Sequence, residues 1–299
     1  MTGFSRAWLK LRESADLAAR DPHLARRFAA ALRRQPGRAL QLIDLGAGTG
    51  ATCRALMPRI GGNQDWLLID HDPSLLAAQL EEMTLWARRQ GYPILAGGGR
   101  ITIASGAARW HVTGRALDLA RDWDALETLE ADGVTASALF DLVSAEWIEH
   151  FAAWLDRRGL PLLAMLTADG RRLWEPPLPG DEQVSAGFSD HQSGDKGFGP
   201  ALGGAAPAAL ARALSARGFD IAQAASDWRL GVREAILLAE LIAGEAEAAA
   251  AARPLDKGMI EDWETGRRRL LENAKLKLAI GHRDVLALPG KTAKIAARN

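Results

Sequence analysis

The sequence predicts an α/β fold, with strands and helices alternating around a mostly parallel, doubly wound sheet. Two observations support this prediction. A short apolar run, residues 40–45, leads directly into a turn with glycine at positions 46, 48 and 50. A second apolar run, residues 66–69, follows one helix length later and ends in Asp70. Short apolar runs separated by helical patterns are typical of buried parallel strands joined by crossover helices.

The segment before the first strand, residues 1–37, is expected to form an N-terminal helical cap. Residues 5–34 place apolar side chains at helical spacing, with charged side chains between them. Pro36 and Gly37 then end the helices. If these helices cover the cleft, Arg12 or Arg20 can reach a bound carboxylate, and a surface ion pair is the alternative for either residue.

The glycine turn predicts a site for a nucleotide-like ligand. Gly46, Gly48 and Gly50 allow a sharp turn and a close approach of the backbone to a ligand. The helix that starts near Ala51 presents free N–H groups to the polar end of such a ligand. Asp70 lies about 20 residues further on, where a carboxylate can accept two hydrogen bonds from ribose hydroxyls. The pattern Gly46-x-Gly48-x-x-Ala51 also fits dinucleotide-binding proteins, so the turn alone leaves the cofactor open.

The two motifs together resemble those of class I S-adenosylmethionine (SAM) dependent methyltransferases. These motifs are Asp44-x-Gly46-x-Gly48-x-Gly50 and Asp70-x-Asp72-Pro73. The resemblance covers most of the chain and implies a Rossmann-like domain over residues 38–299. It implies seven mostly parallel strands with an antiparallel last strand. It also implies SAM as cofactor, S-adenosyl-L-homocysteine as product, and Asp44 and the three glycines as cofactor-binding residues.

The resemblance extends to later segments. Residues 110–119 resemble the third strand, which implies that Asp118 contacts the adenine amino group and Leu119 the adenine ring. Residues 140–147 resemble the fourth strand, whose end lines the methyl-transfer site. That placement assigns Ser144 and Glu146 to the cofactor and Trp147 to the substrate. Residues 160–167 resemble the fifth strand, and residues 276–288 the antiparallel seventh.

The remaining segments are predicted from composition. Glycines at positions 97–99 and 106 indicate a loop or short hairpin before the third strand. Residues 176–199 are rich in Gly, Pro and polar residues, so we expect no regular helix there and interpret 175–203 as a loop that covers the substrate. A helix over 205–217 and a strand over 219–228 follow. Two helices, 233–252 and 257–274, form an insertion over 231–275.

Candidate catalytic residues lie after the fourth and fifth strands. His191 is our first choice as general base, since its unperturbed pKa lies near neutrality, and His150 is the second. Asp190, Lys196 and Phe198 are expected to bind substrate. Asp190, His191 and Asp195 show no standard metal-ligand spacing, so no metal is expected. Trp228 and His282 in the C-terminal half either contact substrate or belong to the core.

These residues favour a methyltransferase that acts on an oxygen or nitrogen of a small molecule. The open alternatives are a Rossmann-fold oxidoreductase that uses NAD or NADP, and a non-catalytic SAM-binding protein. Residues 144–147 lack the Asn/Asp-Pro-Pro-Tyr/Phe motif of DNA adenine and glutamine methyltransferases. Oligomeric state is not readable from these patterns.

Composition agrees with this interpretation. The chain has 299 residues, of which 48% are hydrophobic, enough for a large core. The net charge is zero, so no general attraction to nucleic acid is expected. A single cysteine, Cys53, excludes an intrachain disulfide and fits a cytoplasmic location. No apolar stretch approaches the length of a membrane span.

Overall fold

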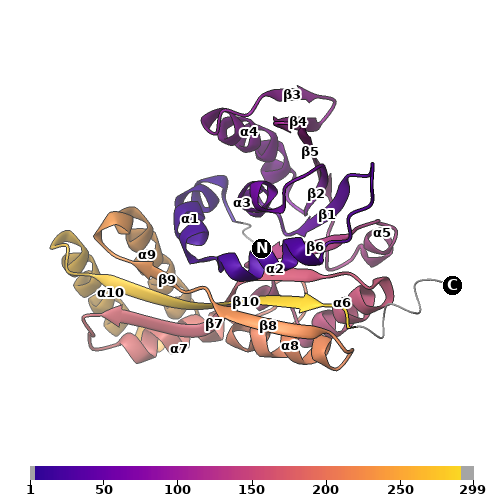
Figure 1. Ribbon diagram of the computed structural model, residues 1–299. Helices are drawn as coiled ribbons and strands as arrows, with labels where there is room; N and C mark the ends of the chain where they lie inside the picture. The colour runs from indigo at the N-terminus through magenta and orange to yellow at the C-terminus, as the bar shows by residue number, and fades with distance from the viewer. Residues whose placement is uncertain (1–3, 291–299) are drawn as a thin grey trace.

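A ten-stranded sheet runs through the molecule in the order β3-β4-β5-β2-β1-β6-β7-β10-β8, with β9 also paired to β10 (Figure 1). The computed structural model describes residues 4–290. Six strands run parallel to one another: β1 (Leu40–Leu45), β2 (Gln64–Asp70), β5 (Ala108–Ala116), β6 (Gly133–Ser137), β7 (Leu162–Glu175) and β8 (Asp220–Ala225). The last strand, β10 (Lys277–Leu288), lies antiparallel between β7 and β8.

These seven strands confirm the predicted fold class. The three others are additions: the hairpin of β3 (Ile94–Gly97) and β4 (Arg100–Ser105) at one edge, and the short β9 (Trp228–Leu230). The hairpin confirms the expectation from the glycines at 97–99. The predicted strand over 219–228 is divided into β8 and β9.

Helices cover both faces of the sheet. They are α1 (Arg6–Ala19), α2 (Pro22–Ala31), α3 (Ala51–Ile60), α4 (Pro73–Arg89), α5 (Trp123–Glu127), α6 (Ala145–Arg158), α7 (Asp181–Gln192), α8 (Ala206–Ser215), α9 (Ala235–Ala252) and α10 (Lys257–Glu272). Four short 3-10 helices complete them: η1 (Phe140–Leu142), η2 (Gly203–Ala205), η3 (Val232–Glu234) and η4 (Pro254–Asp256). The N-terminal helices and the insertion of α9 and α10 agree with the sequence predictions.

Burial on both faces explains why the central strands are almost continuously apolar. In β1, Leu42 belongs to one core cluster and Ile43 and Leu45 to the other, all at most 1% exposed. The alternation of side chains along a strand sends neighbours to opposite faces. Within residues 4–290, we find no helix that is both long enough and apolar enough to cross a membrane.

The prediction that residues 176–199 contain no regular helix is wrong, because this segment contains the helix α7. Gly187 lies within this helix and allows α7 to pack close to α9. A Cβ at Gly187 would lie 3.0 Å from the Cα of Ala249. Gly180 precedes the first turn with a φ of +92°, and Asp181 accepts a hydrogen bond from the Leu178 N–H (2.9 Å). The irregular parts of the segment are therefore residues 176–180 and 193–202.

The fifth strand is also longer than predicted. β7 continues to Glu175 and pairs there with β10, and β10 in turn pairs with β9. We call β7 residues 168–175, β10 residues 277–282 and β9 the sheet extension. One of its faces carries Trp174, which packs edge-on against Trp263 of α10 at 5.7 Å between ring centroids. Helices α7, α9 and α10 pack together beside this extension (Figure 1).

Candidate functional site

The glycine turn has the left-handed backbone that its sequence predicts. Gly46, Gly48 and Gly50 have φ angles of +62°, +53° and +81°, and Gly50 immediately precedes α3. A Cβ at Gly48 would lie 2.9 Å from Leu9 Cδ1 of α1. Side chains are therefore excluded here by both backbone conformation and space.

Asp70, the last residue of β2, is hydrogen-bonded to this turn. Its Oδ2 accepts a hydrogen bond from the Gly48 N–H (2.8 Å), and its Oδ1 accepts one from the Asp72 N–H (3.0 Å). Each carboxylate oxygen has a further lone pair for a ligand hydroxyl. The side chain that sequence analysis assigned to ribose thus also fixes the shape of the turn. Asp72 caps α4 as expected, accepting from the Ser74 N–H (2.8 Å).

Asp118 and Leu119 lie beside this turn. The neighbouring Leu117 N–H donates to the Asp70 backbone carbonyl (3.1 Å). The Asp118 side chain is 40% exposed, and its Oδ1 accepts from the Ala120 N–H (2.9 Å). The Leu119 carbonyl accepts from the Trp147 indole N–H (2.8 Å). The two residues are placed close to Asp70, as the resemblance implies, and their contact with adenine stays a prediction.

The predicted position of the fourth strand, residues 140–147, is wrong. The fourth strand is β6, which pairs with β1 and β7, whereas residues 140–142 form η1. Ser144 is the N-cap of α6 and accepts from the Trp147 N–H (3.2 Å). Glu146 is exposed in the first turn of α6. The residues that follow the true strand end are Ala138, with a φ of +52°, and Leu139.

This correction changes which side chains border the glycine turn. A Cβ at Gly46 would lie 3.3 Å from Leu139 Cδ1. Trp147 is instead 5% exposed in the core, where Phe198 packs edge-on against it at 5.7 Å. The signal for β6 was the buried run Gly133–Ser137, which is short and contains polar residues.

The predicted catalytic histidines are exposed. His150 stacks on Trp123 with 4.1 Å between ring centroids. His191 lies in the last turn of α7, where its carbonyl accepts from Lys196 Nζ (3.1 Å). Asp190 pairs with Arg253 (2.7 Å). The structure thus brings Asp190, His191 and Lys196 near one another without a buried environment, and their catalytic and binding roles stay predictions.

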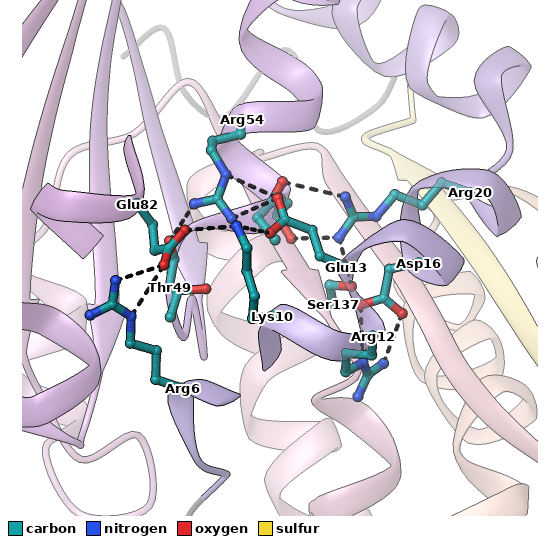
Figure 2. Close-up of polar contacts among 12 residues, drawn as sticks. Arg6, Lys10, Arg12, Glu13, Asp16, Arg20, Thr49, Arg54, Glu82 and Ser137 are labelled. Carbon is teal, nitrogen blue, oxygen red and sulfur yellow. Dashed lines mark hydrogen bonds and ion pairs between the residues drawn. The ribbon is translucent and has the colours of Figure 1, made fainter. Parts of the chain in front are cut away.

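Helix α1 lies directly on the glycine turn, and ion pairs hold it there (Figure 2). Arg6 and Lys10 both reach Glu82 of α4, at 2.8 and 3.0 Å. Glu13 pairs with Arg54 of α3 (2.8 Å). Leu9 of the same helix lies against Gly48, so α1 covers this part of the turn.

Arg20, just after α1, is half-buried and makes no ion pair within residues 4–290. Among residues 4–290, its hydrogen bonds are long: 3.4 Å to the Ala51 carbonyl, 3.2 Å to Thr52 Oγ1 and 3.4 Å to Ser137 Oγ (Figure 2). Its Nε has no partner, and burial lowers the pKa of the guanidinium. Buried charges are normally paired, so this group is suited to an anion supplied by a ligand.

Asp44 is a second side chain near the turn with an unpartnered polar atom. Its Oδ1 accepts from Thr135 Oγ1 (2.7 Å), whereas its Oδ2 is buried and has no partner within the described residues. Burial raises the pKa of Asp44 to about 7, and the charge of Arg20 acts against that shift. Each of the two side chains therefore keeps one unpartnered polar atom, Asp44 Oδ2 at the end of β1 and Arg20 Nε beside the first turn of α3. Together they fit the ammonium and carboxylate of an amino acid.

Several solved structures are similar to this chain, at low sequence identity. A SAM-dependent methyltransferase from Geobacter sulfurreducens, solved with S-adenosyl-L-homocysteine, is 15% identical; the match covers 96% of this chain and 100% of that chain, with a TM-score of 0.44. A cyclopropane-fatty-acyl-phospholipid synthase-like protein from Lactobacillus casei is 12% identical over 96% of this chain and 95% of that chain, with a TM-score of 0.49. A cyclopropane synthase from Mycobacterium tuberculosis is 14% identical over 88% and 82%, with a TM-score of 0.44.

No family model matches the chain, and no curated protein matches it. The fold class therefore rests on the strand order and directions of the sheet itself, and the function on the geometry of the site.

Proposed function

We propose that this protein is a SAM-dependent methyltransferase that transfers a methyl group to an oxygen or nitrogen of a small molecule. The observation that carries the proposal is the pair of unpartnered buried groups, Asp44 Oδ2 and Arg20 Nε, beside the glycine turn. SAM joins an amino acid to an adenosine. Asp44 and Arg20 suit the amino acid, and Asp70 suits the ribose diol.

The alternative nicotinamide cofactors match this site less well. A dinucleotide offers phosphates and ribose hydroxyls but no ammonium group for Asp44. A carboxylate facing a phosphate would be repelled, and burial would strengthen that repulsion. The site chemistry therefore favours SAM over NAD and NADP.

We place the acceptor beside residues 193–202, and the contacts of this segment support a role of 175–203 as a cover. The Leu202 N–H donates to the Val143 carbonyl (3.0 Å), just before Ser144. Gly199 approaches Ser144 closely, since a Cβ there would lie 3.4 Å from Ser144 Cβ. The cover thus contacts the start of α6, close to η1 and the end of β6.

Isothermal titration calorimetry with SAM, S-adenosyl-L-homocysteine, NAD and NADP tests the proposal. We expect binding of the first two only. Asp70→Ala should lower the affinity for S-adenosyl-L-homocysteine about tenfold or more, because hydrogen bonds to a charged acceptor contribute about 1.5–3 kcal/mol each. Tight NAD binding, or unchanged affinity in a folded Asp70→Ala variant, would contradict the assignment. Label transfer from methyl-tritiated SAM separates an enzyme from a protein that only binds SAM.

A further inference from the structure

One edge of the sheet is strongly basic, although the chain as a whole has zero net charge. Residues 83–117, which include most of α4 and the strands β3, β4 and β5, contain five arginines and no aspartate or glutamate. Among residues 4–290, Arg88, Arg89 and Arg115 are exposed and form no ion pair, whereas Arg100 pairs with Asp65 (3.2 Å). Much of the positive charge of this edge is therefore left without a counter-ion in the described part of the chain.

The same strands have one covered and one open face. Helix α4 packs on the face that carries the buried side chains of Ile103 and Trp110, and its Trp86 ring lies 6.5 Å from that of Trp110 (Figure 1). The alternation of side chains sends Leu95 and its cross-strand neighbour Thr102 to the opposite face. Leu95 is 76% exposed there. The open face thus presents an apolar side chain within a basic region.

Strand β3 is the outermost strand, and β4 is its only partner among the described strands. The Pro93 carbonyl accepts from the Ala104 N–H (2.9 Å), just before β3 begins. Because hydrogen bonding alternates along an antiparallel pair, the backbone N–H and C=O groups of Ile94 and Ala96 point away from β4. Edge strands usually avoid further pairing with charged side chains or proline. β3 has neither within Ile94–Gly97, so its outer edge is open to another strand.

Charge and chemistry indicate what this edge binds. A second copy of β3 would bring the same unpaired arginines close to the first set, and like charges repel. A nucleic acid offers phosphates to the arginines but no amide groups to the backbone of β3. It also binds flat surfaces by stacking bases on exposed aromatic rings, whereas Trp86, Tyr92 and Trp110 pack against one another on the side of α4. An acidic peptide segment offers both carboxylates and backbone amides.

We propose that β3 binds an acidic, extended segment of another protein, which adds to the sheet as a further strand. The segment forms backbone hydrogen bonds with Ile94 and Ala96, places an apolar side chain against Leu95, and is attracted by the unpaired arginines. Strands β4, β5 and β2 separate this edge from β1 and the glycine turn. The interaction therefore does not depend on the proposed function.

Fluorescence anisotropy tests the proposal on the whole chain with three labelled peptides. The first peptide has glutamate pairs on both sides of an alternating valine and threonine core. The second has lysine in place of every glutamate, and the third is the acidic peptide with N-methylated core residues, which lack backbone donors. We expect the acidic peptide to bind at least about tenfold more tightly than either of the others. Its binding should weaken as the salt concentration rises.

Amide hydrogen exchange, followed by NMR, gives a signal that is specific to strand addition. The amides of Ile94 and Ala96 point outward in the free protein, whereas that of Leu95 faces β4. With the acidic peptide at about ten times its Kd, exchange at Ile94 and Ala96 should slow about tenfold. The change at Leu95 should be smaller, because its hydrogen bond to β4 exists already.

Charge reversal tests the role of the arginines. Arg88→Glu combined with Arg89→Glu should weaken binding of the acidic peptide about tenfold, because two cations just before β3 become anions. Arg229→Glu combined with Arg233→Glu is the matched control. It changes the net charge equally at two exposed positions of β9 and η3, at the other end of the sheet, and should change the affinity less than about twofold.

Several results would overturn the inference. They are no binding of the acidic peptide, equal binding of the lysine or N-methylated peptide, and unchanged exchange at Ile94 and Ala96. Tighter binding of a single-stranded DNA oligonucleotide than of the acidic peptide would assign the surface to nucleic acid instead. A dimer in sedimentation velocity that slows exchange at Ile94 would assign it to a second copy of the chain. SAM binding is measured separately, so none of these results decides the proposed function.

Discussion

Asp70 and Asp44, the two acidic residues at the glycine turn, satisfy their polar groups differently. Both oxygens of Asp70 accept backbone hydrogen bonds, from Gly48 and Asp72. Asp44 Oδ2 is buried and has no partner within the described residues. A buried polar group without a partner costs about 1–3 kcal/mol.

The comparison indicates two modes of binding. Asp70 is held by hydrogen bonds within the protein, so its contribution to binding depends on geometry that is already present. Asp44 Oδ2 is left without a partner, so a ligand that supplies a hydrogen bond there removes an existing cost. Leu9 of α1 lies against the same turn at Gly48.

The largest effect is expected from a side chain placed in the turn. Gly48→Val adds a β-branched residue at a φ of +53° and puts Cβ 2.9 Å from Leu9 Cδ1. We expect the affinity for S-adenosyl-L-homocysteine to fall about 100-fold or more, which corresponds to about 2.7 kcal/mol. Isothermal titration calorimetry measures the change.

Gly61→Val is the matched control, because Gly61 also has a positive φ, +64°, but nothing lies within 4 Å of its Cβ position. Gly61→Val therefore has the strain of a positive φ but not the close contact with Leu9. Equal affinities in the two variants would show that the turn is not a binding surface, and the contrast between the two acidic residues would have no bearing on binding.

The second effect concerns pH. The pKa of Asp44 is raised to about 7 from an ordinary value of 3.8. The folded protein therefore holds this proton more tightly than the unfolded chain, so the group's contribution to stability falls as pH rises from about 4 to about 7. Asp44→Asn should flatten this part of the pH dependence, as measured by urea denaturation at several pH values.

Ligand binding should reveal the same group. A ligand ammonium beside Asp44 favours its carboxylate, so S-adenosyl-L-homocysteine binding near pH 6 should release about one proton from wild type and less from Asp44→Asn. Titration in two buffers of different ionisation enthalpy measures this release. Identical proton release in the two proteins would place the ammonium elsewhere.

The sequence predicted the turn well because its determinants are local. Glycines with positive φ, and the Asp72-Pro73 helix start, are fixed by residues a few positions apart, and each formed as expected. Contacts between distant segments could not be predicted in this way. The Trp228 indole N–H donates to Asp16 Oδ1 (3.0 Å) across 212 positions of sequence, and only the packing of α1 on β9 brings the two side chains together.

The misplaced fourth strand has a similar cause. The apolar residues around Phe140 resemble a strand more than the true β6, which begins at Gly133 and contains Thr135. Gly133 is required by tertiary packing, because a Cβ there would lie 2.6 Å from Leu32 Cδ2 of the N-terminal segment. In α7, Gly187 also meets a distant neighbour, Ala249. Glycines chosen for packing look like loop formers when only the sequence is read.

A smaller effect is expected at the ion pairs that hold α1. Glu82 binds both Arg6 and Lys10 and is 6% exposed, whereas Glu81 binds Arg6 alone and is 59% exposed. Glu82→Gln should loosen α1 and raise the association rate of S-adenosyl-L-homocysteine about threefold. Glu81→Gln should change it little, since exposed pairs contribute little. Stopped-flow tryptophan fluorescence measures the rate; a slower rate in Glu82→Gln would mean that α1 does not restrict entry to the turn.

The smallest effect is expected at His191, which began as the candidate base. His191 lies at the end of α7 with an exposed side chain, so water can take its place as proton acceptor. We expect His191→Ala to keep at least about half of the wild-type rate of methyl transfer from SAM between pH 6 and 9. A loss of about 10²-fold or more, with unchanged affinity for S-adenosyl-L-homocysteine, would show instead that His191 is the general base.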